Sequence, residues 1–138
     1  MPKSIENSYD VPLQNKIPAP FLEIVVSDPS GRKRVILTPM VDTGYDGALL
    51  LPLDTYNELS LYAYQYPDGE VVGETVTGEK IDLLSAEAKI EISGLDFQTL
   101  AVVDAFRGCN QVLVGRALLQ NLIVTLNGLK GKLRASLE

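Results

Sequence analysis

The chain has 138 residues, of which 46% are hydrophobic and 22% charged, a composition typical of one globular domain and not of a disordered chain. Its 12 basic and 18 acidic residues give a net charge of −6, which argues against nucleic acid or an anionic membrane as the main partner. The apolar runs are far shorter than the roughly 18 residues of a membrane span, so no membrane partner is expected.

The chain contains one cysteine, Cys109, and no histidine. A single cysteine excludes an intrachain disulfide and fits a reducing compartment, and the N-terminus lacks an apolar signal core, so we expect a cytoplasmic protein. Without histidine, Ser-His-Asp and Cys-His catalysis are excluded, and neither a metal nor another cofactor is expected. Cys109 is interpreted as a half-buried structural thiol, and carboxylates remain as the acid–base groups.

The first 20 residues are polar and carry four prolines, which predicts an N-terminal arm over 1–20 and a folded domain over 21–138. In that domain, short apolar runs bounded by turn residues predict strands. In chain order they are Phe21–Ser27, Arg34–Leu37, Ala48–Leu51, Val71–Glu74, Lys80–Leu84, Ala86–Ser93, Phe97–Val103, Gln111–Val114, Leu122–Leu126 and Lys132–Leu137.

Between these strands the sequence predicts two short helices, one over Thr55–Leu59 with Asp54 as its cap and one over Arg116–Gln120. The alternating tyrosines of Leu61–Tyr66 predict a further strand, whose rings pack across strands or line a groove. Ala105–Asn110 is expected to be a loop. Many short strands with one or two small helices indicate an all-β barrel or sandwich.

The tripeptide Asp42-Thr43-Gly44 stands between two apolar runs that are expected to form core strands. Burying a carboxylate is costly, so one placed between such segments needs a partner or a chemical task. A carboxylate followed by a small hydroxyl and a glycine is the way an aspartic peptidase displays its catalytic group. The alternative is an Asx-type turn residue with no chemistry. Five other aspartates lack this context and are interpreted as surface or turn residues: Asp54, Asp68, Asp82, Asp96 and Asp104.

Taken with two later segments, Val112–Leu119 and Thr125–Asn127, the stretch Val41–Asp46 resembles a retropepsin-type (clan AA) aspartic protease. This single-domain, homodimeric group includes retroviral proteases and their archaeal and bacterial relatives. The resemblance covers roughly residues 20–137. It implies a closed acid-protease-like barrel with one or two short helices and a flap hairpin, assembled as a homodimer.

The resemblance also implies roles for the residues of the first motif. Asp42 would be the catalytic aspartate, paired with Asp42 of a second chain. Thr43 would hydrogen-bond across the dimer floor, and Gly44 would allow the two loops and the substrate backbone to approach closely.

Other matched positions would support this loop. Asp46 and Arg116 would form an ion pair between the catalytic loop and the late helix, and Gly115 would let its strand pass close beneath the loop. By position, the tip at Thr77, Gly78 and Glu79 would be the flap that closes over bound peptide. Lys132–Leu137 is a candidate for the dimer sheet.

Two carboxylates held about 3 Å apart share one proton, so one member is a general base for water and the other a general acid. The predicted function is therefore an aspartic endopeptidase, with a peptide or protein as substrate. The alternative is a retropepsin-fold dimerisation or peptide-binding module with little or no turnover. A third possibility is an unrelated β-barrel in which the motif is accidental.

Overall fold

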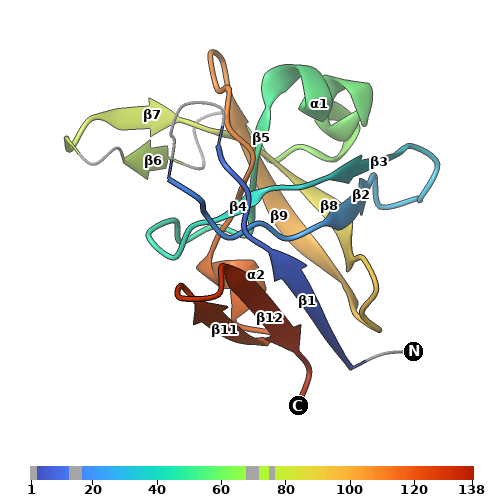
Figure 1. Ribbon diagram of the computed structural model, residues 1–138. Coiled ribbons are helices and arrows are strands. Elements are labelled where there is room, and N and C mark those ends of the chain that lie inside the picture. The colour runs from blue at the N-terminus through green and yellow to red at the C-terminus, as the bar shows by residue number, and fades with distance from the viewer. Residues whose placement is uncertain (1–2, 13–16, 68–71, 75–76) are drawn as a thin grey trace.

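The computed structural model describes residues 3–12, 17–67, 72–74 and 77–138, and over these ranges the chain is built mainly of strands (Figure 1). The strands are β1 (Ser4–Ser8), β2 (Ile24–Ser27), β3 (Arg34–Leu37), β4 (Met40–Val41), β5 (Leu49–Pro52), β6 (Val72–Glu74), β7 (Lys80–Asp82), β8 (Leu84–Ile92), β9 (Gln98–Phe106), β10 (Leu113–Val114), β11 (Ile123–Asn127) and β12 (Lys132–Ser136). The helices are α1 (Leu53–Glu58), the 3-10 turn η1 (Leu61–Tyr64) and α2 (Arg116–Leu119).

The largest sheet has seven strands in the order β3-β2-β8-β9-β5-β10-β4 and curls into a half-barrel. β8 and β9 form its long antiparallel centre, while β5 runs parallel to β9 and β4 parallel to β10. An antiparallel bridge between Phe21 and Met40 links the segment before β2 to β4, at the other end of the strand order. The predicted all-β, barrel-like fold with two short α-helices is confirmed.

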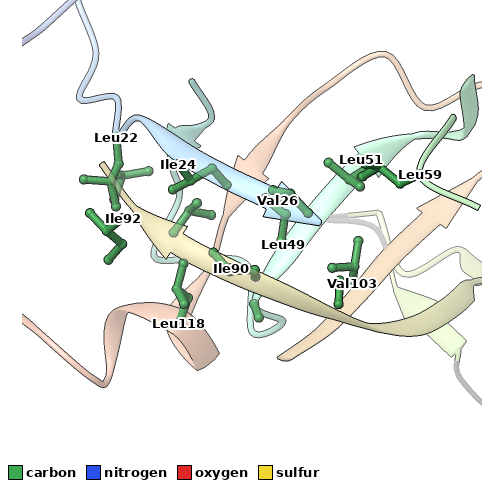
Figure 2. Packing of buried hydrophobic residues seen from close by; sticks show 14 of the residues in the cluster. Leu22, Ile24, Val26, Leu49, Leu51, Leu59, Ile90, Ile92, Val103 and Leu118 are labelled. Atoms are coloured by element: carbon green, nitrogen blue, oxygen red, sulfur yellow. The ribbon is translucent and has the colours of Figure 1, made fainter. Parts of the chain in front are cut away.

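The core fills the inside of this curled sheet. Along β8 every second residue from Ala86 to Ile92 is buried, which is the alternation that a strand with one core face requires. Figure 2 shows Ile24 and Val26 of β2 gathered with Ile90 of β8 and Leu118 of α2. Each such side chain contributes about 1.5–3 kcal/mol when fully buried, so this cluster supports the strands that carry the site.

A second sheet joins the two ends of the chain in the order β1-β12-β11. β1 pairs antiparallel with β12, from Ser4 opposite Ser136 to Ser8 opposite Lys132, so the expectation of an arm outside the compact fold is wrong for these residues. The strand was missed because it is polar and has no fully buried residue, although Ile5 packs against the core. β12 has neighbours on both sides, which leaves β1 and β11 as the edges of this sheet.

The tyrosine run is not a strand. Ser60 takes a left-handed conformation with φ of 54°, after which Leu61–Tyr64 form the 3-10 turn η1 around the buried Leu61. Tyr62 is 62% exposed, while Tyr64 and Tyr66 are 38% and 39% exposed, and the Tyr64 hydroxyl lies 3.3 Å from an Asp28 carboxylate oxygen. The preceding helix also differs from the prediction: it begins at Leu53 after Pro52, so Asp54 lies in its first turn and does not cap it.

The hairpin predicted for residues 71–84 is present as β6 and β7, which pair antiparallel with Gly73 opposite Ile81. Val71, Thr75 and Val76 lie outside the described residues. In Figure 1 the hairpin projects to the left, on the same side as the loop between β4 and β5. None of the described helices has the length and apolar character needed to cross a membrane.

Candidate active site

Asp42 lies at the end of β4, where β10 determines its position. The Met40 amide donates to the Val112 carbonyl at 3.1 Å, and the Asp42 amide donates to the Val114 carbonyl at 2.9 Å. Because β4 and β10 run parallel, these bonds continue their ladder to the first residue of the loop. The two sequence motifs, about 70 residues apart, therefore lie side by side.

A tight turn orients the Asp42 carboxylate. The Gly44 amide donates to Asp42 Oδ1 at 2.9 Å, and the Tyr45 amide donates to the Asp42 carbonyl at 3.2 Å. A Cβ on residue 44 would lie 3.2 Å from the same Oδ1, so a glycine gives the carboxylate room to take this position. Asp42 is half-buried and borders a cleft, where its oxygens are within reach of a bound molecule.

Backbone bonds join the Asp42 loop to the start of α2. The Arg116 amide donates to the Tyr45 carbonyl at 2.9 Å, and the Ala117 amide donates to the Gly47 carbonyl at 3.2 Å. The predicted ion pair between Asp46 and Arg116 is not formed: the ion pairs within the described ranges are Lys3–Glu138 and Arg34–Glu91. Loop and helix are joined here by backbone groups, which do not depend on the two charged side chains.

The cleft beside Asp42 has a volume of about 830 Å³ and lies between the Asp42 loop, β9 and the β6–β7 hairpin. Its apolar lining includes Leu50, Ile81, Leu83, Leu100, Val102 and Phe106. Gly73 and Glu74 of β6 also line it, so the stem of the hairpin borders the cleft. The predicted flap residues Thr77, Gly78 and Glu79 lie beyond that stem and are not part of the described lining. Gly78 has φ of +86°, which suits a turn at the hairpin tip.

A second hollow of about 360 Å³ lies on another side of the Asp42 loop. Thr43 and Arg116 line it together with apolar residues of α2, of β11 and of the turn between them, among them Leu122, Val124 and Leu126. Thr43 and Arg116 are both exposed, and Leu126 is 48% exposed. The loop therefore presents Asp42 to the cleft and Thr43 to an uncovered, partly apolar face.

Asp104 is the site residue that the sequence analysis placed wrongly. It was interpreted as a surface or turn residue, but it is 6% exposed and lies inside β9, which continues to Phe106. Ser85 Oγ donates to Asp104 Oδ1 at 2.7 Å, and the Tyr45 hydroxyl donates to Oδ2. The signal that could have identified it is the one used for Asp42, a carboxylate within an apolar run, here Ala101–Ala105.

Burial and the negative charge of Asp104 raise the pKa of Tyr45 far above its ordinary value of 10.0. Burial likewise raises the pKa of the Cys109 thiol, which is half-buried and donates to the Gln111 carbonyl at 3.4 Å, as expected for a structural thiol. Among the described residues, no group of three or more histidine, cysteine, aspartate or glutamate side chains is arranged to hold a metal ion.

The raised pKa of Tyr45 predicts a specific alkaline destabilisation. Above pH 10.0 the unfolded chain releases the Tyr45 proton while the folded protein keeps it, so the free energy of unfolding falls as the pH rises. Tyr45→Phe removes this titration, and its free energy of unfolding should fall less steeply between about pH 9.5 and 11. Urea denaturation of both proteins at equal concentration measures the two slopes, and identical slopes would contradict the assignment.

Neither a known family model nor a curated protein matches the sequence, but solved structures share its fold. The EIAV protease complexed with the inhibitor HBY-793 is 21% identical and superposes with a TM-score of 0.51 over 74% of this chain and 86% of its own. A retropepsin-like aspartic protease from Rickettsia conorii is 16% identical, with a TM-score of 0.56 over 96% of this chain and 90% of its own. The chain therefore has a retropepsin-type fold.

Proposed function

We propose that this chain is an aspartic endopeptidase that acts as a homodimer, with Asp42 of each protomer supplying one of the two catalytic carboxylates. The observation that carries the proposal is the Asp42 turn itself, a carboxylate held by the Gly44 amide at the edge of a cleft large enough for a peptide. The retropepsin-type fold supports it, because the same fold occurs in an inhibitor-bound protease and in a retropepsin-like aspartic protease.

The need for two chains follows from the carboxylates that line the cleft. Among the described residues, the cleft carboxylates besides Asp42 are Asp46 and Glu74, both exposed, and Asp104, whose two oxygens already accept from Tyr45 and Ser85. None of these three lies in an Asp-Thr-Gly turn. A symmetric dimer supplies the missing partner by placing a second, identical turn opposite the first.

The exposed face around Thr43 is the surface on which we place the second protomer. Thr43 lies on the same loop as Asp42, so a two-fold axis close to it brings both Asp42 turns together. The partly apolar hollow beside it, bordered by Leu126, would lose contact with water in such a dimer. In this arrangement Arg116, which makes no ion pair with Asp46, lies beside the dimer contact.

The two carboxylates divide the chemistry between them. At about 3 Å separation they share one proton, because both cannot ionise easily at that distance. The ionised Asp42 accepts a proton from a water molecule as that water attacks the scissile carbonyl carbon. The protonated Asp42 first donates to the carbonyl oxygen, and a proton is then delivered to the leaving nitrogen as the C–N bond breaks.

The shape of the cleft favours an extended peptide as substrate. The β6–β7 hairpin borders one side, and a peptide in extended form can add to such a backbone as a further strand. On β9, Leu100 and Val102 face the cleft and are 55% and 38% exposed, so apolar substrate side chains would cover them. We therefore expect cleavage within segments that carry apolar side chains.

The dimer requirement predicts that specific activity depends on protein concentration. Below the dissociation constant of the dimer, cleavage of a fluorogenic peptide library should fall in proportion to the dimer fraction measured by light scattering. The assay is run at acidic and neutral pH, with a transition-state mimic of aspartic proteases as the inhibitor control. A strictly monomeric protein that cleaves would contradict the proposal, and a dimer that binds the mimic without cleaving would favour the peptide-binding module.

A further inference from the structure

Asp104 is a hidden carboxylate on the cleft-facing side of β9. Its strand neighbours at alternate positions, Val102 and Phe106, line the cleft, and Asp104 borders it as well. Yet its side chain is almost fully shielded from solvent. Ser85, its partner across the β8–β9 ladder, donates to one oxygen, and the hydroxyl of Tyr45 donates to the other.

The phenol ring of Tyr45 reaches Asp104 through space left free by two glycines. A Cβ on residue 47 would lie 2.3 Å from the Tyr45 hydroxyl oxygen and 2.8 Å from Asp104 Oδ2. A Cβ on residue 115 would lie 2.5 Å from Tyr45 Cδ2. The ring thus extends from the Asp42 loop to β9, and backbone on one side and the Asp104 contact at its tip hold it in place.

We propose that Tyr45, held by Asp104, is a specificity-determining residue that fills the subsite beside Asp42, restricts it to small side chains and hides a carboxylate that would bind a basic one. The inference rests on the proposed peptidase function of the cleft. Tyr45 borders the cleft three residues after Asp42, so its ring takes up volume that a substrate side chain next to the reacting bond would need.

Removing the ring should have two separable effects. The first is steric: the vacated volume admits a longer side chain, and discrimination by a pocket of fixed size is typically 10–200-fold per methylene group. The second is electrostatic: Asp104 loses its Tyr45 donor, and the exposed oxygen can accept from an ammonium group. Norleucine and lysine side chains have similar length, so comparing them separates the charge effect from the size effect.

The test uses peptides in which Ala, norleucine or Lys occupies each of the four positions around the scissile bond in turn. For wild type and Tyr45→Phe, kcat/KM at one of these positions should fall at least about tenfold from Ala to norleucine or Lys. In the series Tyr45→Leu, Tyr45→Val and Tyr45→Ala that loss should shrink progressively. In Tyr45→Ala, kcat/KM should be higher for the Lys peptide than for the norleucine peptide. In Tyr45→Ala/Asp104→Asn, this difference should disappear, while kcat/KM for the norleucine peptide stays above its wild-type value.

If Tyr45→Ala does not fold, Tyr45→Leu and Tyr45→Val still test the inference. Both should show a smaller loss of kcat/KM from Ala to norleucine or Lys than the wild type. Folded variants with the wild-type profile at all four positions would overturn the inference while leaving the proposed function intact. If the wild type itself does not cleave, the proposed function fails. The subsite is then tested by fluorescence anisotropy, which measures the affinities of the Ala, norleucine and Lys peptides. If Asp42→Asn and Asp42→Asn/Tyr45→Leu bind these peptides in the same order of affinity, the inference about Tyr45 is overturned.

Discussion

Replacing Asp42 with asparagine should lower kcat/KM by at least about 10³-fold while leaving the fold and the dimer intact. In a homodimer one substitution removes both carboxylates, so neither the general base nor the general acid remains. An amide cannot accept the proton of the attacking water. The asparagine oxygen can still accept from the Gly44 amide, so the turn that positions residue 42 retains its hydrogen bond.

A matched control for this variant is Asp96→Asn, the same chemical change at an exposed residue in the turn between β8 and β9. Its kcat/KM should equal that of the wild type. Circular dichroism and light scattering on both variants separate loss of chemistry from loss of structure. An Asp42→Asn dimer that keeps more than a tenth of wild-type activity would show that this carboxylate is not the catalytic group.

The sequence located the Asp42 loop and its β10 partner because each carries a local signal. Asp42 is a carboxylate between apolar runs, and Val112–Val114 is an apolar run that ends at a glycine. The hairpin β6–β7 was equally visible, from two short runs around Gly78. Features of this kind depend on a few adjacent residues, and the structure has them where the sequence predicted them.

Asp104 carries the same local signal as Asp42, a carboxylate within an apolar run, but the segments that bury it are distant in the chain. The last residues of β9 pair with β5, with Leu50 opposite Asp104 and Pro52 opposite Phe106, about 54 residues apart in the chain. No local pattern reveals that parallel pairing, so the strand was predicted to stop at Val103. The same limit applies to β1, a polar strand whose partner β12 lies at the other end of the sequence.

The junction between the loop and α2 was misjudged for a different reason. The resemblance implied an ion pair of Asp46 with Arg116, but the structure joins the two segments through the carbonyls of Tyr45 and Gly47. Backbone hydrogen bonds can be made by nearly every residue type and so leave little trace in a sequence. The sequence does show one requirement of this junction, the glycine at position 115, because a larger residue there would clash with the loop.

Replacing Gly115 with alanine should destabilise the protein by about 2–6 kcal/mol and remove activity with it. The residue has φ of −111° and ψ of −175°, an extended conformation open to any residue, so backbone freedom is not the reason for the glycine. Space is the reason. The added Cβ would lie 2.3 Å from the Gly47 carbonyl oxygen and 2.5 Å from the Tyr45 carbonyl oxygen.

Those two oxygens accept the amides of Ala117 and Arg116, so the clash cannot be relieved without moving the Asp42 loop away from α2. Losing two such bonds costs about 1–3 kcal/mol in total, and residual overpacking adds about 1–3 kcal/mol. The Asp42 amide bonds Val114, the residue before Gly115, so the displacement also disturbs the carboxylate. Activity should therefore be lost even in the fraction of the protein that remains folded.

Gly128→Ala is the matched control, because a Cβ at Gly128 meets no atom within 4 Å and its φ is not left-handed. It should change the free energy of unfolding by less than about 1 kcal/mol. Urea denaturation at one protein concentration compares the two variants, since a dimer's apparent stability depends on concentration. If Gly115→Ala were as stable and as active as Gly128→Ala, the loop would not be packed against β10 and α2, and the position of Asp42 would need another cause.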